Sequence, residues 1–190
     1  MFNKEDLPSD YQWIDINPEL DQALQLIKHT NQNLNIIGPA GVGKSLLLRL
    51  ICNNTFLPGN TVVLSSTGIA AVNASSEGVQ GSTVHSFFKF KPLTIYTPGM
   101  LYMKNELYEV MNNIDTLVID EVSMVNASLF DFMIETLLLY RSKQYKSIPR
   151  IILFGDILQL PPVVDTSNTD IAKYFSEVYN GKYMYFNSNS

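Results

Sequence analysis

The sequence has a single cysteine, Cys52, and no long uninterrupted apolar run. One thiol cannot form an internal disulfide, which fits a reducing compartment. Its place on the apolar side of a helical pattern predicts a buried side chain rather than a reactive one. No stretch approaches about 18 consecutive apolar residues, so we expect no membrane span, and residues 1–16 lack the basic start and apolar core of a signal peptide. These absences predict a cytoplasmic or nuclear protein.

Basic residues are also scarce, because 13 Lys and Arg stand against 18 Asp and Glu, a formal net charge of −5. The chain has no general basic character of the kind that attracts nucleic acid, so any strand-binding surface must be local. Hydrophobic residues make up 46% of the 190 residues, enough to bury the core of one globular domain.

The most informative stretch is LNIIGPAGVGKSLLLRL at 34–50, which reads as an apolar strand, a glycine-rich turn and an apolar helix. It contains the G-x-x-x-x-G-K-[ST] pattern of a phosphate-binding loop. Gly41 and Gly43 let backbone N–H groups approach a triphosphate, and the dipole of the following helix adds positive potential there. Lys44 is predicted to reach the β- and γ-phosphates, and the Ser45 hydroxyl to ligate Mg²⁺. The predicted nucleotide-binding residues are Gly38, Pro39, Ala40, Gly41, Val42, Gly43, Lys44, Ser45 and Leu46.

Two carboxylates, Asp120 and Glu121, follow an apolar strand predicted at 116–119. Carboxylates at the end of a buried strand are costly unless they meet a metal or a substrate. Beside a phosphate-binding loop, Asp120 would hold Mg²⁺, and Glu121 would orient and deprotonate an attacking water. The alternative is that the two acids merely begin a solvated loop. With the glycine-rich loop upstream, the pair favours hydrolysis over binding alone.

A third polar stretch, GDILQLPPV at 155–163, follows the strand predicted at 151–154. Because ligands of open α/β sheets gather at the carboxyl ends of strands, all three stretches are expected to converge on one crevice. Gln159 carries an amide able to contact a γ-phosphate or its attacking water. The alternative is a loop amide that bonds only to backbone.

The spacing of apolar residues predicts the secondary structure. Asn17 followed by Pro18 is typical of a helix start. We expect helices at 18–29, 100–113, 126–141 and 170–179 besides the one after the loop, and strands at 34–37, 61–64, 116–119, 151–154 and 182–186. The stretch 65–82, rich in Ser, Gly and Ala, suits a loop with a short helix. The alternation indicates an α/β fold with a parallel sheet covered by helices on both faces, and residues 1–16 as a lead-in to one domain at 17–190.

Five stretches resemble, in order, motifs I, Ia, Ib, II and III of PIF/RecD-like superfamily 1 DNA helicases: GPAGVGKS, STGIAAVNA, GSTVHSFF, IDEVSM and GDILQLPPV. The resemblance covers about residues 17–165. The stretches GSTVHSFF and GDILQLPPV are specific to this family, whereas the phosphate loop and the acidic pair occur in many P-loop ATPases. The resemblance implies a RecA-like P-loop NTPase fold and an ATP-driven motor that moves 5′→3′ on single-stranded DNA and unwinds the duplex ahead.

The resemblance also implies a role for each residue of the nucleotide site. Lys44 and Ser45 are assigned to the triphosphate and Mg²⁺, Asp120 to Mg²⁺, and Glu121 to water activation. Gln159 becomes the γ-phosphate sensor that links hydrolysis to movement. In the family a glutamine before motif I reads the adenine. Gln22 is the nearest candidate, with a glutamine on a helix surface as the alternative.

Residues that match the motifs along the DNA strand are Thr67, Gly68, His85, Ser86 and Phe87. Small residues allow backbone N–H groups near phosphate, and an aromatic face can stack on a base. The alternatives are structural. Phe87 and Phe88 could both belong to the core, where we expect at least one of them, and His85 could be a local hydrogen-bonding residue.

The sequence departs from the family in one respect: no arginine follows Val163. Family motors have a second RecA-like domain that supplies arginines to the transition state, which are worth about 10³–10⁵ in rate. The chain therefore looks like the first motor domain of a longer protein, expected to bind ATP–Mg²⁺ weakly, hydrolyse it slowly and unwind nothing alone. Its implied partners are single-stranded DNA and that second domain.

Two other functions use the same phosphate loop. A P-loop ATPase switch acting on a protein partner would share Lys44, Asp120 and Glu121 but leave Thr67, His85 and Gln159 without a nucleic-acid role. A small-molecule kinase needs a lid with substrate-binding arginines, and the basic residues form no such cluster in the sequence.

Overall fold

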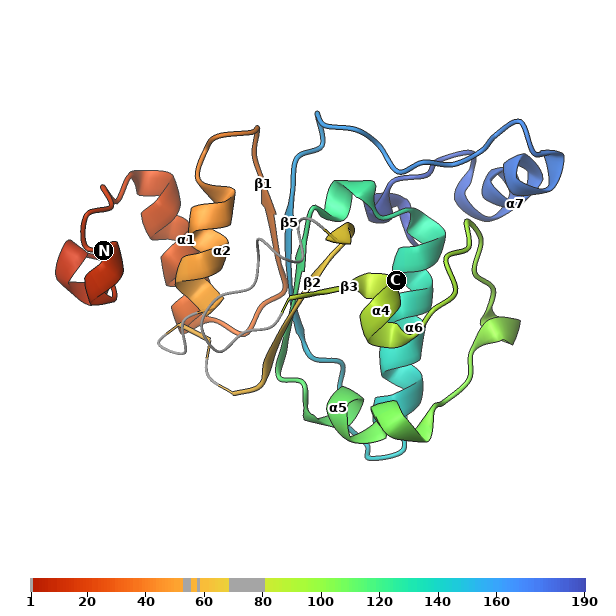
Figure 1. Cartoon of the computed structure of the whole chain (residues 1–190), viewed down its shortest axis with the longest axis horizontal. Coiled ribbons are helices and arrows are strands. Elements are labelled where there is room, and N and C mark those ends of the chain that lie inside the picture. The colour runs from red at the N-terminus through yellow and green to blue at the C-terminus, as the bar shows by residue number, and fades with distance from the viewer. Residues whose placement is uncertain (1, 53–55, 58, 69–80) are drawn as a thin grey trace.

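The computed structural model describes residues 2–52, 56–57, 59–68 and 81–190 (Figure 1). Among these residues, five strands form one sheet in the order β1-β5-β4-β2-β3, and every neighbouring pair is parallel. The strands are β1 (Leu34–Ile37), β2 (Thr61–Ser65), β3 (Ser82–Thr83), β4 (Thr116–Asp120) and β5 (Arg150–Gly155). The predicted α/β class with a parallel sheet is confirmed.

The central strands are buried on both faces. Along β4, Leu117, Val118 and Ile119 are fully buried, but they alternate between two separate cores. Val118 packs with Ile152 and Phe154 on one face of the sheet, whereas Leu117 and Ile119 pack on the other. Continuous apolar strands are what a parallel sheet covered on both faces requires.

Helices cover the two faces, as Figure 1 shows. One face carries α1 (Pro18–His29) and α2 (Lys44–Cys52), and the other carries α4 (Val84–Phe88), α5 (Tyr108–Asn113) and α6 (Ala127–Ser142). The helix α7 (Thr169–Tyr179) packs against the start of α6 through Phe175 and Tyr179. The Asn17 side chain accepts a hydrogen bond from the Leu20 N–H at 2.8 Å, with Pro18 in the first turn, so the predicted helix start is confirmed.

The first residues join the domain rather than extend from it. Phe2, Leu7 and Ile14 are buried in the core beneath α1 and α2. The predicted short helix within 65–82 lies largely outside the described residues, because 69–80 are not described. No helix of the described ranges has both the length and the apolar character needed to cross a membrane.

Most of the helix predicted at 100–113 is absent, and only α5, Tyr108–Asn113, is α-helical. Short 3₁₀ turns at Pro98–Met100 and Asn105–Leu107 flank an extended stretch. The reason is a tertiary contact, because the Tyr140 hydroxyl on α6 accepts a hydrogen bond from the Lys104 N–H at 2.6 Å and donates to the Lys104 carbonyl. Backbone groups held in this way are not available to a helix.

The strand predicted at 182–186 is also wrong. This segment makes a single antiparallel bridge between Met184 and Asn126, followed by a 3₁₀ turn at Tyr185–Asn187. Its backbone caps the start of α6 instead, because the Tyr183 carbonyl accepts a hydrogen bond from the Ala127 N–H at 2.9 Å. The apolar spacing therefore reflects packing on α6 and not an added sheet strand.

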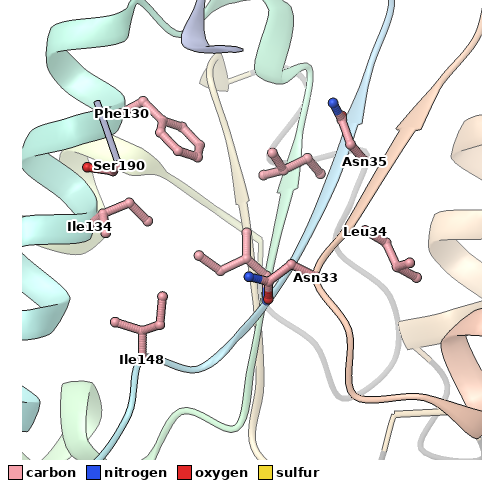
Figure 2. Close-up of a pocket in the computed structure, with 9 residues that line it drawn as sticks. Asn33, Leu34, Asn35, Phe130, Ile134, Ile148 and Ser190 are labelled. Atoms are coloured by element: carbon pink, nitrogen blue, oxygen red, sulfur yellow. The ribbon is translucent and has the colours of Figure 1, made fainter. Parts of the chain in front are cut away.

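An apolar groove lies between α6 and strands β1 and β5. Within the described residues β1 pairs only with β5. Figure 2 shows Phe130 and Ile134 of α6 on one side of this space and β1 on the other, where Asn35 faces it and the side chain of Leu34 points away. The groove lies beside the start of β1, whereas the glycine-rich loop follows the end of that strand. It is therefore separate from the predicted nucleotide site.

The contact that replaces the predicted helix can be tested by Tyr140→Phe. Loss of the hydroxyl should lower the free energy of unfolding by about 1 kcal/mol, the usual net value of a hydrogen bond, measured by urea denaturation. Tyr108→Phe is the control, because no hydrogen bond of the Tyr108 hydroxyl exists among the described residues, and it should change stability by less than about 0.5 kcal/mol. Equal stability of the two variants would contradict this account.

Candidate nucleotide and strand-contact site

The glycine-rich loop turns sharply between β1 and α2. Gly41 and Gly43 have φ angles of +81° and +95°, which residues with a Cβ rarely adopt. The Gly38 N–H donates to the carbonyl of Gly155 at the end of β5, which ties the loop to the neighbouring strand at 3.2 Å. Residues 39–43 are exposed at the N-terminus of α2. An exposed turn of backbone N–H groups at a helix N-terminus suits phosphate.

Lys44 is the cation of this loop. Its Nζ donates hydrogen bonds to the Gly38 and Pro39 carbonyls at 2.6 and 2.8 Å, so the ammonium lies across the turn. Ser45 is exposed in the first turn of α2, and Leu46 is half-buried behind it. The structure therefore places a positive charge and a hydroxyl at the mouth of the loop.

Asp120 lies on the same edge of the sheet, at the end of β4. Burial raises the pKa of the Asp120 carboxyl, and the neighbouring charge of Glu121 raises it further. The Glu121 N–H, which donates to Asp120 Oδ1 at 2.9 Å, and the charge of Lys44 lower the pKa. The strand register brings the loop after β1 and the end of β4 to the same edge of the sheet, because β5 pairs with both strands.

Glu121 has an unusual backbone and an unsatisfied side chain. Its φ is +53°, a left-handed conformation that is strained for a glutamate. Its Oε2 is buried and has no hydrogen-bond partner among the described residues. Backbone strain and unsatisfied polar atoms concentrate at functional sites. Both features support a ligand-facing role for this carboxylate.

The turn after β5 begins with Gly155 and Asp156, which belong to the GDILQLPPV stretch but have no role predicted from the sequence. A Cβ on Gly155 would lie 3.0 Å from Val122 Cγ1, so the end of β5 packs tightly on the segment after Glu121. Asp156 is buried, and its Oδ1 accepts a hydrogen bond from the Leu158 N–H at 3.0 Å. The only sequence signal for these two residues is the GD pair itself.

Gln159 lies in this turn, with its N–H donating to the Asp156 carbonyl at 3.1 Å. Its side chain is exposed, and no hydrogen bond joins it to Lys44 or Asp120, both of which the structure describes. Gln22 is exposed near the start of α1. Gln159 thus lies at the predicted edge of the sheet, but its side-chain amide does not contact Lys44 or Asp120.

The predicted DNA-contacting residues follow β2 and β3, the two strands at one edge of the sheet. Thr67 and Gly68 come directly after β2, where the Ser66 N–H donates to the Asp120 carbonyl at 3.4 Å. His85, Ser86 and Phe87 lie on α4, which the Thr83 hydroxyl caps by accepting from the Ser86 N–H at 3.1 Å.

Of the aromatic pair on α4, Phe88 is buried, as expected for at least one of them, and Phe87 is half-buried edge-on to it. Ser86 is exposed on the same short helix. His85 is half-buried, and burial lowers the pKa of its imidazole. The group predicted to meet DNA therefore mixes exposed and partly packed side chains.

A parallel sheet with a phosphate-binding loop after β1 and carboxylates after β4 defines a RecA-like P-loop NTPase domain. A family model described as PIF1-like helicase matches residues 16–183. The chain belongs to the PIF1-like helicase family.

Similar proteins agree with this assignment. The ATP-dependent DNA helicase Pif1 of Bdellovibrio bacteriovorus is 32% identical over 164 residues, which cover 83% of this chain and 35% of that protein. The ATP-dependent DNA helicase dda of Enterobacteria phage T4 is 30% identical over 166 residues, covering 86% and 35%. The Pif1 helicase from Bacteroides, solved in complex with ADP-AlF3 and ssDNA, has a TM-score of 0.76 at 30% identity, covering 93% of this chain and 39% of that chain. The chain spans about a third of the length of these curated relatives.

Cys52 provides a test of the packing behind the loop. Burial, with a smaller effect from the charge of Asp120, raises the pKa of the Cys52 thiol to about 12. A thiol with a raised pKa stays protonated and unreactive at pH 8. A disulfide reagent should therefore label the folded chain at least ~100-fold more slowly than the urea-unfolded chain. Rapid stoichiometric labelling of the folded chain would contradict this packing.

Proposed function

We propose that this chain is the first, ATP-binding motor domain of a 5′→3′ DNA helicase that couples ATP hydrolysis to translocation on single-stranded DNA and to duplex unwinding. The observation that carries the proposal is that the glycine-rich loop after β1 and Asp120 at the end of β4 lie at the same edge of one parallel sheet, in a chain of the PIF1-like family. The named activity of the relatives and the nucleotide and strand bound by the Bacteroides protein support it.

In this proposal the residues of the loop, 38–46, hold the triphosphate. Lys44 leaves the loop carbonyls to bind the β- and γ-phosphates. The charged phosphate oxygens form stronger hydrogen bonds with its ammonium than the neutral carbonyls do. Glu121 orients and deprotonates the attacking water, and Gln159 closes from the exposed turn onto the γ-phosphate. Gln22 is the proposed adenine contact.

Ser45 and Asp120 are the proposed Mg²⁺ ligands. The site fits a cation, because Asp120 is partly buried with a raised pKa and Glu121 Oε2 is buried without a partner among the described residues. A hydroxyl, a carboxylate and phosphate oxygens form the oxygen-rich set that Mg²⁺ prefers. Mg²⁺ held by Ser45 and Asp120 would supply positive charge beside the phosphates.

Single-stranded DNA is the proposed second ligand, contacted by Thr67, Gly68, His85, Ser86 and Phe87. A second RecA-like domain is proposed to supply the arginines that complete the nucleotide site, because the curated relatives are much longer than this chain, which spans about a third of their length. Work on a DNA substrate would place the protein in the cytoplasm or the nucleus.

Two substitutions separate nucleotide binding from hydrolysis. Lys44→Ala should abolish ATP binding, because the phosphates lose their cation. Glu121→Gln should bind ATP as the wild type does but turn it over about 10²–10⁴-fold more slowly, because the general base is lost. Fluorescent-nucleotide titration and phosphate release measure the two effects in the full-length protein. Normal turnover by Glu121→Gln would show that the base is another group.

The DNA role is tested by the ATPase rate. Full-length protein should hydrolyse ATP faster when single-stranded DNA is added, and Thr67→Ala should weaken that stimulation while leaving the basal rate unchanged. Strand binding should weaken as salt increases, because phosphate contacts release counterions. If folded, nucleotide-bound protein responds to no single strand, the helicase proposal fails and a protein-directed P-loop switch is favoured.

A further inference from the structure

Tyr96 lies buried in the segment between α4 and α5, and its hydroxyl has three partners. It lies 2.6 Å from the Lys91 carbonyl, 3.1 Å from the Leu93 N–H and 2.9 Å from Nε2 of His85. A phenol hydroxyl has one proton to donate and two lone pairs that accept. All of its hydrogen-bonding capacity is therefore used.

The identity of these partners decides which nitrogen of His85 carries its proton. A carbonyl can only accept, so the Tyr96 proton goes to Lys91, and a backbone N–H can only donate, so Leu93 donates to Tyr96. The remaining contact requires a proton on His85 Nε2, which donates to the Tyr96 oxygen. The hydrogen-bond network, rather than an observed hydrogen, assigns this tautomer.

The other ring nitrogen, Nδ1, is then a hydrogen-bond acceptor. It makes no hydrogen bond within the part of the chain that the structure describes, and it is not a buried unsatisfied atom. Burial lowers the pKa of His85, which keeps the imidazole neutral at neutral pH. His85 thus offers a lone pair rather than a positive charge.

A single DNA strand offers few groups that can donate a hydrogen bond to this lone pair. Along the strand, phosphates and deoxyribose oxygens only accept hydrogen bonds, and donors occur only as N–H groups on the bases. We propose that Tyr96 is a positioning residue that holds His85 as its Nε2–H tautomer, so that Nδ1 accepts a hydrogen bond from a base N–H of single-stranded DNA. This inference rests on the proposed function, because it specifies how the predicted strand contact is made.

Tyr96 is itself held firmly enough to position another residue. Its N–H donates to Ser128 Oγ on α6 at 2.8 Å, and the Tyr174 hydroxyl on α7 donates to its carbonyl at 2.9 Å. Its ring stacks on Phe132 with centroids 5.0 Å apart. A rigid supporting residue is what a precisely aimed contact needs.

The first test is the proton on His85, observed by NMR of full-length protein with ¹⁵N-labelled histidine, with His29 as the internal reference. We expect an Nε2–H signal of His85 that is protected from exchange with water. It should disappear in Tyr96→Phe, which keeps the ring, and persist in Tyr174→Phe, which loses a hydroxyl bonded to Tyr96 but not to His85. A proton on Nδ1 in the wild type, or an Nε2–H signal that survives Tyr96→Phe, would overturn the proposal.

The second test compares the affinity of full-length protein for oligothymidylate and for the same strand with N3-methylthymine, which lacks the one N–H donor of the base. Wild type should bind the methylated strand about fivefold more weakly, the factor expected for one hydrogen bond. His85→Phe, which keeps an aromatic ring but has no hydrogen-bond acceptor, should bind both strands equally. Tyr96→Phe should reduce the difference, and Tyr174→Phe should retain it.

The outcomes separate this inference from the proposed function. If His85→Phe discriminates between the strands as the wild type does, the base contact is wrong although strand binding stands. If His85→Phe lowers the slope of log affinity against log salt by about 0.7, the value for one phosphate on a single strand, His85 contacts the backbone and the inference fails. If the wild type binds neither strand, the proposed function itself is wrong.

Discussion

Parallel pairing of the strands is the constraint on which the site depends. The pairs Ile37↔Gly155, Ile119↔Leu153 and Ser65↔Asp120 show that the central strands end at one edge of the sheet. Two cores maintain this register, because neighbouring residues such as Val118 and Ile119 pack on opposite faces. A slip of one residue would exchange the faces of every side chain. The hydrophobic core therefore positions the loop, the carboxylates and the turn after β5 together.

At that edge, the chain carries features that oppose folding. Asp120 is partly buried with a raised pKa, Glu121 adopts a left-handed backbone, and one of its oxygens has no partner among the described residues. Each feature is unfavourable in the isolated domain, and strain of this kind costs of order 1–3 kcal/mol per residue. It persists because the tightly paired strands on both sides leave the segment after β4 little freedom. A cation and a triphosphate at this position would relieve part of it.

Local signals explain which parts of the fold the sequence predicts. Asn17 and Pro18 mark the start of α1, and apolar runs mark four of the strands, because these patterns depend on near neighbours. The helix expected at 100–113 fails because Tyr140, a residue on another helix, binds the backbone of Lys104. The strand expected at 182–186 does not form because the Tyr183 carbonyl accepts a hydrogen bond from the Ala127 N–H at the start of α6. Loop motifs predict the nucleotide residues, but the network around Tyr96 joins residues from α4, α6 and α7 and has no local pattern.

The sheet also brings the proposed hydrolytic and strand-binding residues close together. Ser66, next to Thr67, donates its N–H to the carbonyl of Asp120, and β3, which leads directly into α4, pairs with the end of β2. Only one strand separates the end of β4 from the helix that carries His85. A change at the nucleotide of the proposed motor would need no long pathway to reach the DNA, because the carbonyl of Asp120 accepts a hydrogen bond from the Ser66 N–H. In the proposed motor, short-range coupling of this kind joins the two ligands through the edge of the sheet.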